Sequence, residues 1–113
     1  MRIDVTQHIK DYKGEDIKTS EDSNLELRDV ISTAINTLPT QKEKQMTTEQ
    51  KNKAYQISIK IWSDKIVDFT VDDRKFIKDK VGEVYTPLIY GRVSDIFEEK
   101  DSDDKDQKGS VKG

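Results

Sequence analysis

The hydrophobic residues of the chain follow two different periods, and the change between them falls near residue 27. In residues 2–9 apolar and polar positions alternate, which is typical of a half-buried strand. The apolar positions of this stretch are Ile3, Val5 and Ile9. Gly14 can adopt the positive φ of a turn, and residues 17–19 then return as a second short strand. The start of the chain therefore predicts a β-hairpin.

From residue 27 onward the apolar residues recur at the spacing of an amphipathic helix. The first helix carries its stripe at Leu27, Val30, Ile31, Ala34, Ile35 and Leu38. Pro39 ends this helix, because the residue before a proline is disfavoured in the α region.

A second helix is expected to begin after Thr47 and to run to about Ser63. Thr47 is followed three positions later by Gln50, which is the pattern of a capping box. Its apolar residues cover a wide arc, so we expect it to touch neighbours on more than one side. The arc consists of Ala54, Tyr55, Ile57, Ile59, Ile61 and Trp62.

Two further helices follow a short extended link at residues 66–69. Thr70 precedes two acidic residues, and the helix dipole favours acids in a first turn. Thr86 followed by Pro87 is a favoured N-cap and first helical position. The last helix is expected to end near Glu99.

These signals predict one α+β domain over residues 1–99, with a short N-terminal β-hairpin packed on a compact bundle of about four helices. Residues 100–113 contain one apolar residue, Val111, and are expected to form a disordered, acidic and lysine-containing tail. No internal repeat is visible along the chain.

Composition limits the core and excludes several classes of function. Apolar residues make up 32% of the chain and charged residues 38%, so the core must be small. Twenty basic and 23 acidic residues give a net charge of −3, which argues against strong non-specific binding of nucleic acid. The absence of cysteine removes disulfides and thiolate chemistry. No apolar run reaches the length of a signal peptide or membrane span, so we expect a cytoplasmic protein.

Few side chains could carry catalysis. His8 is the single histidine, and it is expected to be half-exposed on the first strand. With one histidine and no cysteine, the three or four ligands of a zinc site are missing. Residues 101–104 are acidic but lack the spacing of an EF-hand loop, and no glycine motif could hold a phosphate. We therefore expect no enzyme, no metal and no cofactor.

The segment that joins the last two predicted helices is the strongest candidate for contact with a partner. Its apolar residues Val84, Ile89 and Val93 are expected in the core. Tyr85, Tyr90 and Arg92 are the candidate contact residues, because Tyr and Arg are favoured interface anchors. Gly91 lies inside a predicted helix, which suggests the close approach of another backbone or surface.

A second candidate surface is basic. Lys51, Lys53 and Lys60 give the second predicted helix a local positive charge, whereas Asp95 to Asp106 contains seven acids and two lysines. The simplest interpretation is a pair of solvated faces of opposite charge. The functional alternatives are a bipolar surface for protein partners or a basic face that touches nucleic acid.

Three segments of the sequence resemble one group of viral proteins. They are Leu27-Arg28-Asp29-Val30-Ile31, Tyr55-Gln56-Ile57-Ser58-Ile59-Lys60-Ile61 and Val81-Gly82-Glu83-Val84-Tyr85-Thr86-Pro87-Leu88-Ile89-Tyr90-Gly91-Arg92-Val93. Together they are similar to small, uncharacterised proteins encoded by tailed phages and prophages, over about residues 3–99. The resemblance implies a viral setting and carries over no active residues.

Two functions fit these features. The first is a non-catalytic phage or prophage accessory protein that acts through protein–protein contacts, in virion or tail assembly or on a host factor. Its partner would be a phage or host protein in the host cytoplasm, or a second copy of the chain. The alternative is a small helical nucleic-acid-binding regulator that uses Lys51, Lys53 and Lys60. Neither function involves a membrane.

Overall fold

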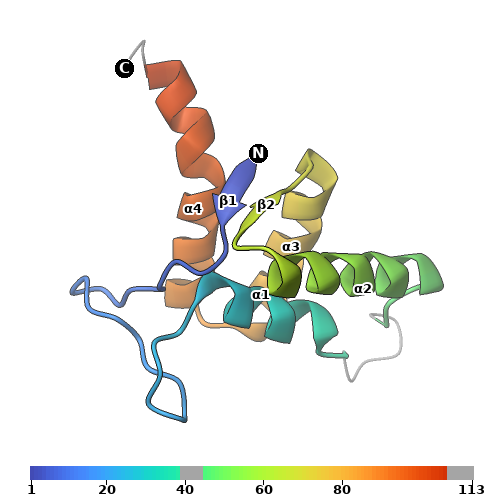
Figure 1. The fold of residues 1–113 in the computed structure, drawn as a ribbon, viewed down its shortest axis with the longest axis horizontal. Helices are drawn as coiled ribbons and strands as arrows, with labels where there is room; N and C mark the ends of the chain where they lie inside the picture. Colours follow the sequence, from blue (N-terminus) through green and yellow to red (C-terminus); the bar gives the residue numbers. More distant parts are fainter. Residues whose placement is uncertain (39–44, 107–113) are drawn as a thin grey trace.

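The structure is a computed structural model that describes residues 1–38 and 45–106, with side chains described as far as residue 98. In chain order the elements are β1 (Arg2–Asp4), α1 (Leu27–Asn36), α2 (Thr48–Ser63), β2 (Ile66–Asp68), α3 (Val71–Val84) and α4 (Pro87–Asp106). Figure 1 shows α3 and α4 upright on either side of the two strands, with α1 and α2 crossing beneath them. The predicted fold class, an α+β domain with a short N-terminal β-hairpin packed on a compact bundle of about four helices, is confirmed.

The two strands form a small antiparallel sheet that joins distant parts of the sequence. Ile3 of β1 lies opposite Val67 of β2, and both side chains are buried. The backbone N–H of Val5 extends the pairing by donating to the carbonyl of Lys65 at 2.9 Å. The extended link predicted at residues 66–69 is therefore the partner of the first strand, a pairing that the sequence did not indicate.

The predicted hairpin is the first of two consecutive hairpins between β1 and α1. Lys10 pairs with Asp16 around the first turn, and Lys18 pairs with Asn24 around the second. Three backbone hydrogen bonds connect the ends of these hairpins to one another. The N–H of Ile17 donates to the carbonyl of Ile9 at 3.1 Å, the N–H of Leu25 to that of Ile17 at 2.8 Å, and the N–H of Ile9 to that of Leu25 at 2.8 Å. Ile9 is fully buried, and Ile17 and Leu25 pack against the core.

The two hairpins repeat the same plan at an interval of eight residues. In each, a lysine side chain donates across the hairpin, from Lys10 to Asp16 and from Lys18 to Asn24. A side-chain oxygen at the next position, on Asp11 or Thr19, accepts two backbone N–H groups of the turn. A residue with positive φ follows, Gly14 at 84° or Asp22 at 63°. The chain thus contains an internal repeat, and the prediction of none was wrong.

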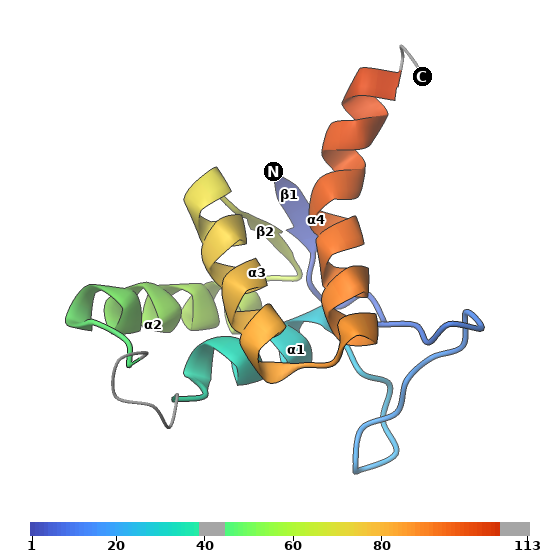
Figure 2. The same cartoon turned by 180° about the vertical axis from the view of Figure 1, so that it is seen from behind.

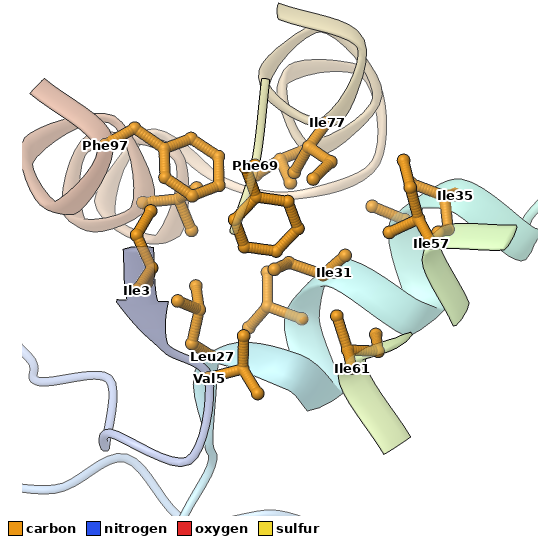
Figure 3. Close-up of a cluster of buried hydrophobic side chains, with 14 of the residues drawn as sticks. Ile3, Val5, Leu27, Ile31, Ile35, Ile57, Ile61, Phe69, Ile77 and Phe97 are labelled. Carbon is orange, nitrogen blue, oxygen red and sulfur yellow. The ribbon is translucent and has the colours of Figure 1, made fainter. Parts of the chain in front are cut away.

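Helix α1 lies at the centre of the hydrophobic core. Its residues Leu27, Val30, Ile31, Ala34 and Ile35 are all at most 1% exposed. Figure 3 shows that side chains from β1, α2, α3 and α4 converge on this helix around Phe69. The ring of Phe69 lies 5.8 Å from that of Phe97, in a tilted arrangement that favours aromatic pairs.

The predicted helix starts are confirmed for α2, α3 and α4. Thr47 and Gln50 form a complete capping box at α2, and Thr70 forms one with Asp73 at α3. Helix α4 begins at Pro87 and runs past Glu99, where its end was predicted, to Asp106. Residues 107–113 of the predicted tail lie outside the described residues.

Some residues predicted to be buried are exposed. Helix α1 ends at Asn36, so Leu38 lies beyond it and is 60% exposed, while Pro39 lies outside the described residues. Val84, at the last position of α3, is 38% exposed. The wide arc of α2 is divided: Ala54, Ile57 and Ile61 are buried, whereas Tyr55, Ile59 and Trp62 are not.

The repeat supplies a matched pair of substitutions at its two turns. Gly14→Ala should lower the free energy of unfolding by about 1–2 kcal/mol, because an alanine is strained at positive φ. No atom lies within 4 Å of the added Cβ, so the cost comes from the backbone alone. Asp22→Gly should change the free energy of unfolding by less than about 0.5 kcal/mol. Glycine relieves the strain of positive φ in the folded state, but it also raises the conformational entropy of the unfolded chain, and the two effects offset each other. Urea unfolding measures both, and a neutral Gly14→Ala would contradict the expected strain.

Candidate functional site

Two of the predicted contact residues, Tyr85 and Tyr90, meet at the junction of α3 and α4. Tyr85 caps α3 and is partly buried against the core. Tyr90 is 38% exposed, and its ring lies over Gly82, where an added Cβ would sit 3.5 Å from two ring carbons. The two rings line one hollow of about 520 Å³, together with Lys78, Asp79, Gly82 and Pro87. The junction therefore presents a small aromatic surface.

Arg92, the third predicted contact residue, lies apart from the two tyrosines. Its Nε donates to the backbone carbonyl of Lys10 at 2.9 Å, and its terminal nitrogen donates to that of Asp11. Arg92 therefore fastens the first hairpin to α4. It borders a larger hollow of about 870 Å³ between α4 and residues 4–10.

Gly91 is not in the crowded position that was predicted for it. A Cβ at this position would meet no atom within 4 Å, so nothing in the described chain approaches it closely. The ring of Tyr90 lies instead against Gly82, where an added Cβ would be in ordinary van der Waals contact with it. The prediction of close approach at Gly91 was therefore wrong.

The three lysines of the predicted basic face do not form one surface. With 3.6 residues per turn, Lys53 and Lys60 lie on one side of α2, and Lys51 is about 200° away from Lys53. The ammonium of Lys53 lies 3.3 Å from a carboxylate oxygen of Asp73, which ties α2 to the start of α3. Lys51 and Lys60 are exposed.

Asp73 serves both as a capping residue and as an ionic partner. Its carboxylate accepts from the backbone N–H of Thr70 at 3.1 Å and pairs with Lys53. Burial alone would raise the pKa of this carboxyl. The Thr70 hydrogen bond and the Lys53 charge outweigh burial and hold the pKa below its ordinary value of 3.8.

An apolar surface that the sequence analysis did not single out lies on α2. Tyr55, Ile59 and Trp62 are 61%, 44% and 50% exposed, and their spacing of four and three residues places them along one side of the helix. We call these three residues the α2 stripe. The guanidinium carbon of Arg28 lies 4.7 Å from the centre of the Trp62 ring, within the range of a cation–π contact.

A sequence signal for the α2 stripe did exist. The buried residues Ala54, Ile57 and Ile61 form one helical stripe, and the α2 stripe lies about 140° around the axis from them. Two separate stripes on one helix indicate two separate surfaces. The six residues together span a wide arc, so the division appears only in the angles between them.

The ionisable groups of the N-terminal region stabilise structure. His8 Nδ1 lies 3.3 Å from one carboxylate oxygen of Asp16, and Lys10 donates to the other. The hydrogen bond and charge of Lys10 hold the pKa of the Asp16 carboxyl below its usual range. Among residues 1–38 and 45–98, no three His, Asp or Glu side chains are grouped so as to hold a metal ion.

Comparisons with protein-family models, with curated proteins and with solved structures find no match to this chain. In the described part of the chain, no helix has the length and apolar character needed to cross a membrane.

The depressed pKa of Asp73 predicts a pH dependence of stability. The folded state favours the carboxylate, so its contribution should be complete above about pH 4 and decline as the pH falls through the folded-state pKa. Asp73→Asn should cost about 1–2 kcal/mol at pH 7 and flatten the acid limb of the stability curve. Urea unfolding between pH 7 and pH 2.5 measures both effects.

Asp79→Asn is the matched control for this prediction. Asp79 lies on the same helix and pairs with Lys75 at 3.5 Å, but both side chains are largely exposed, so the pair contributes little. An acid limb that Asp73→Asn leaves unchanged would show that Asp73 does not carry the linkage.

Proposed function

We propose that this protein is non-catalytic and acts through protein–protein contact, with the α2 stripe as its main contact surface. The observation that carries the proposal is the exposure of Tyr55, Ile59 and Trp62 together on one side of a helix. Single exposed apolar residues are common on soluble proteins, but grouped ones mark interaction sites.

The residue types of the α2 stripe support this proposal. Tyrosine and tryptophan supply large contact area with few rotatable bonds, and they are enriched among residues that dominate binding energy. The contact with Arg28 holds the Trp62 ring in place, because the guanidinium stacks on its face. A side chain that is ordered before binding loses less entropy when a partner covers it.

The hollow at Tyr85 and Tyr90 is a second, smaller surface of the same kind. Its rings are less exposed than those of the α2 stripe, and Tyr85 contributes to the core. We assign it a secondary part in contact with the partner. Arg92 acts at a distance from this hollow, by holding the first hairpin.

The setting of the proposed function comes from the sequence resemblance. Similarity to small proteins of tailed phages and prophages supports a role as an accessory protein in the host cytoplasm. Such a protein would take part in virion or tail assembly, or would modulate a host factor, by binding a phage or host protein.

The alternative, a helical nucleic-acid-binding regulator, has less support. Lys53 is engaged by Asp73, and Lys51 points away from Lys53 and Lys60. Non-specific binding depends on several cations that reach phosphates together. The net charge of −3 further weakens long-range attraction to a polyanion.

A pair of charge substitutions on α2 tests the proposal. Ile59→Glu places a charge in the centre of the α2 stripe, and Lys60→Gln makes the same change in net charge at an exposed position about 100° around the helix axis from Ile59. Immobilised wild-type protein should retain a defined partner from lysate of phage-infected cells. Ile59→Glu should reduce this retention at least about tenfold, whereas Lys60→Gln should preserve it.

Circular dichroism and thermal unfolding control for loss of fold in both variants. Equal retention by the wild type and Ile59→Glu would rule out the α2 stripe as the contact surface. Salt-dependent retention of DNA or RNA that falls in a Lys51→Gln, Lys60→Gln double variant would instead support the nucleic-acid alternative.

A further inference from the structure

We infer that the α2 stripe binds a second copy of this chain, with the two α2 helices antiparallel about a twofold axis near Ile59. This inference rests on the proposed function and specifies its partner. Three properties of the helix point to it: the spacing of the stripe, the placement of charge along it, and the area that it exposes.

The spacing of the α2 stripe is close to symmetric about its middle residue. Tyr55 lies four residues before Ile59, and Trp62 lies three residues after it. When two such helices run antiparallel about Ile59, Tyr55 of each copy meets Trp62 of the other. An aromatic ring then packs against an aromatic ring at both ends, and the interface is self-complementary, as a twofold contact requires.

The charge on α2 favours the antiparallel direction over the parallel one. Lys51 is exposed near the N-terminus of α2, where a positive charge opposes the dipole of its own helix. In an antiparallel pair, Lys51 lies near the C-terminal end of the other α2, which carries partial negative charge and is followed by Asp64. A parallel pair would instead place the two copies of Lys51 side by side.

The exposed area of the α2 stripe fits a weak dimer. An aromatic side chain has about 150–250 Å² to bury, so at the observed exposures the three residues offer roughly 250–300 Å² per copy. A standard interface buries about 800 Å² per partner, of which somewhat more than half is apolar. The stripe and its polar border therefore support association that depends on protein concentration, rather than a permanent dimer.

The position of α2 leaves room for a second helix. Helix α2 lies at the side of the molecule and extends beyond the other helices in both views (Figures 1 and 2). Its buried side faces α1 and β2 through Ala54, Ile57 and Ile61. The α2 stripe lies on another side of the helix from these buried residues, and Trp62 of the stripe contacts Arg28 of α1.

Sedimentation velocity on the full chain tests the association. From about 1 to 500 μM, the wild type should shift from the mass of one chain toward the mass of two. Ile59→Glu should weaken the dimer at least about tenfold, because it places two carboxylates together on the axis. Lys60→Gln should leave it within about twofold. A wild type that remains monomeric over this range would overturn the inference.

Engineered cysteines test the direction of pairing, since the chain has none of its own. Ile59→Cys lies at the axis, where the two copies approach closely enough for a disulfide, so mild oxidation should link it to its counterpart. Lys51→Cys lies eight residues away, which at 1.5 Å per residue separates the two copies by about 24 Å, far beyond disulfide reach. Equal cross-linking at both positions would show a parallel pair and overturn the antiparallel arrangement.

These outcomes are separable from those of the proposed function. A chain that stays monomeric but loses a lysate partner through Ile59→Glu would contradict the second copy and retain protein contact through the α2 stripe. A dimer sensitive to Ile59→Glu, with no partner dependent on Ile59, would support self-association alone.

Discussion

Burial of the apolar side of α1 is the interaction on which the rest of the structure depends. This helix contacts α2 and α3, and the carbonyls of Val5 and Gln7 accept the N–H groups at its start. With 32% apolar residues, the chain has little other surface to bury. Replacing Ile31, which is completely buried on α1, by a smaller residue would therefore weaken several contacts at once.

Local chemistry explains why the helices could be predicted from the sequence. A capping threonine and the 3.6-residue period are short-range signals, and they identified the starts of α2, α3 and α4. Pairing between β1 and β2 joins residues more than 60 positions apart, and no local pattern specifies it. The repeat of the two hairpins was not predicted because its copies form the same turn with different residues. The side-chain acceptor is Asp11 in one and Thr19 in the other, and the residue at positive φ is Gly14 or Asp22.

The candidate site was predicted in part for the same reason. Residue type and position brought Tyr85 and Tyr90 to attention, and the structure places them in one hollow. Arg92 and Lys53 are engaged by partners that are distant in the sequence. Arg92 binds a carbonyl of the first hairpin and Lys53 pairs with Asp73, and no helical pattern could reveal either contact. Charged side chains near the core are therefore poor evidence for a free binding face until their partners are known.

The two stripes of α2 separate folding from contact within one helix. Ala54, Ile57 and Ile61 hold the helix against α1, whereas Tyr55, Ile59 and Trp62 each leave 44–61% of their surface exposed. Exposed apolar side chains carry a cost in solubility, and a chain with so few apolar residues would bury them if stability were their purpose. Their position on the outer side of an already anchored helix instead fits a surface whose shape is fixed before a partner arrives, which reduces the entropy lost on association.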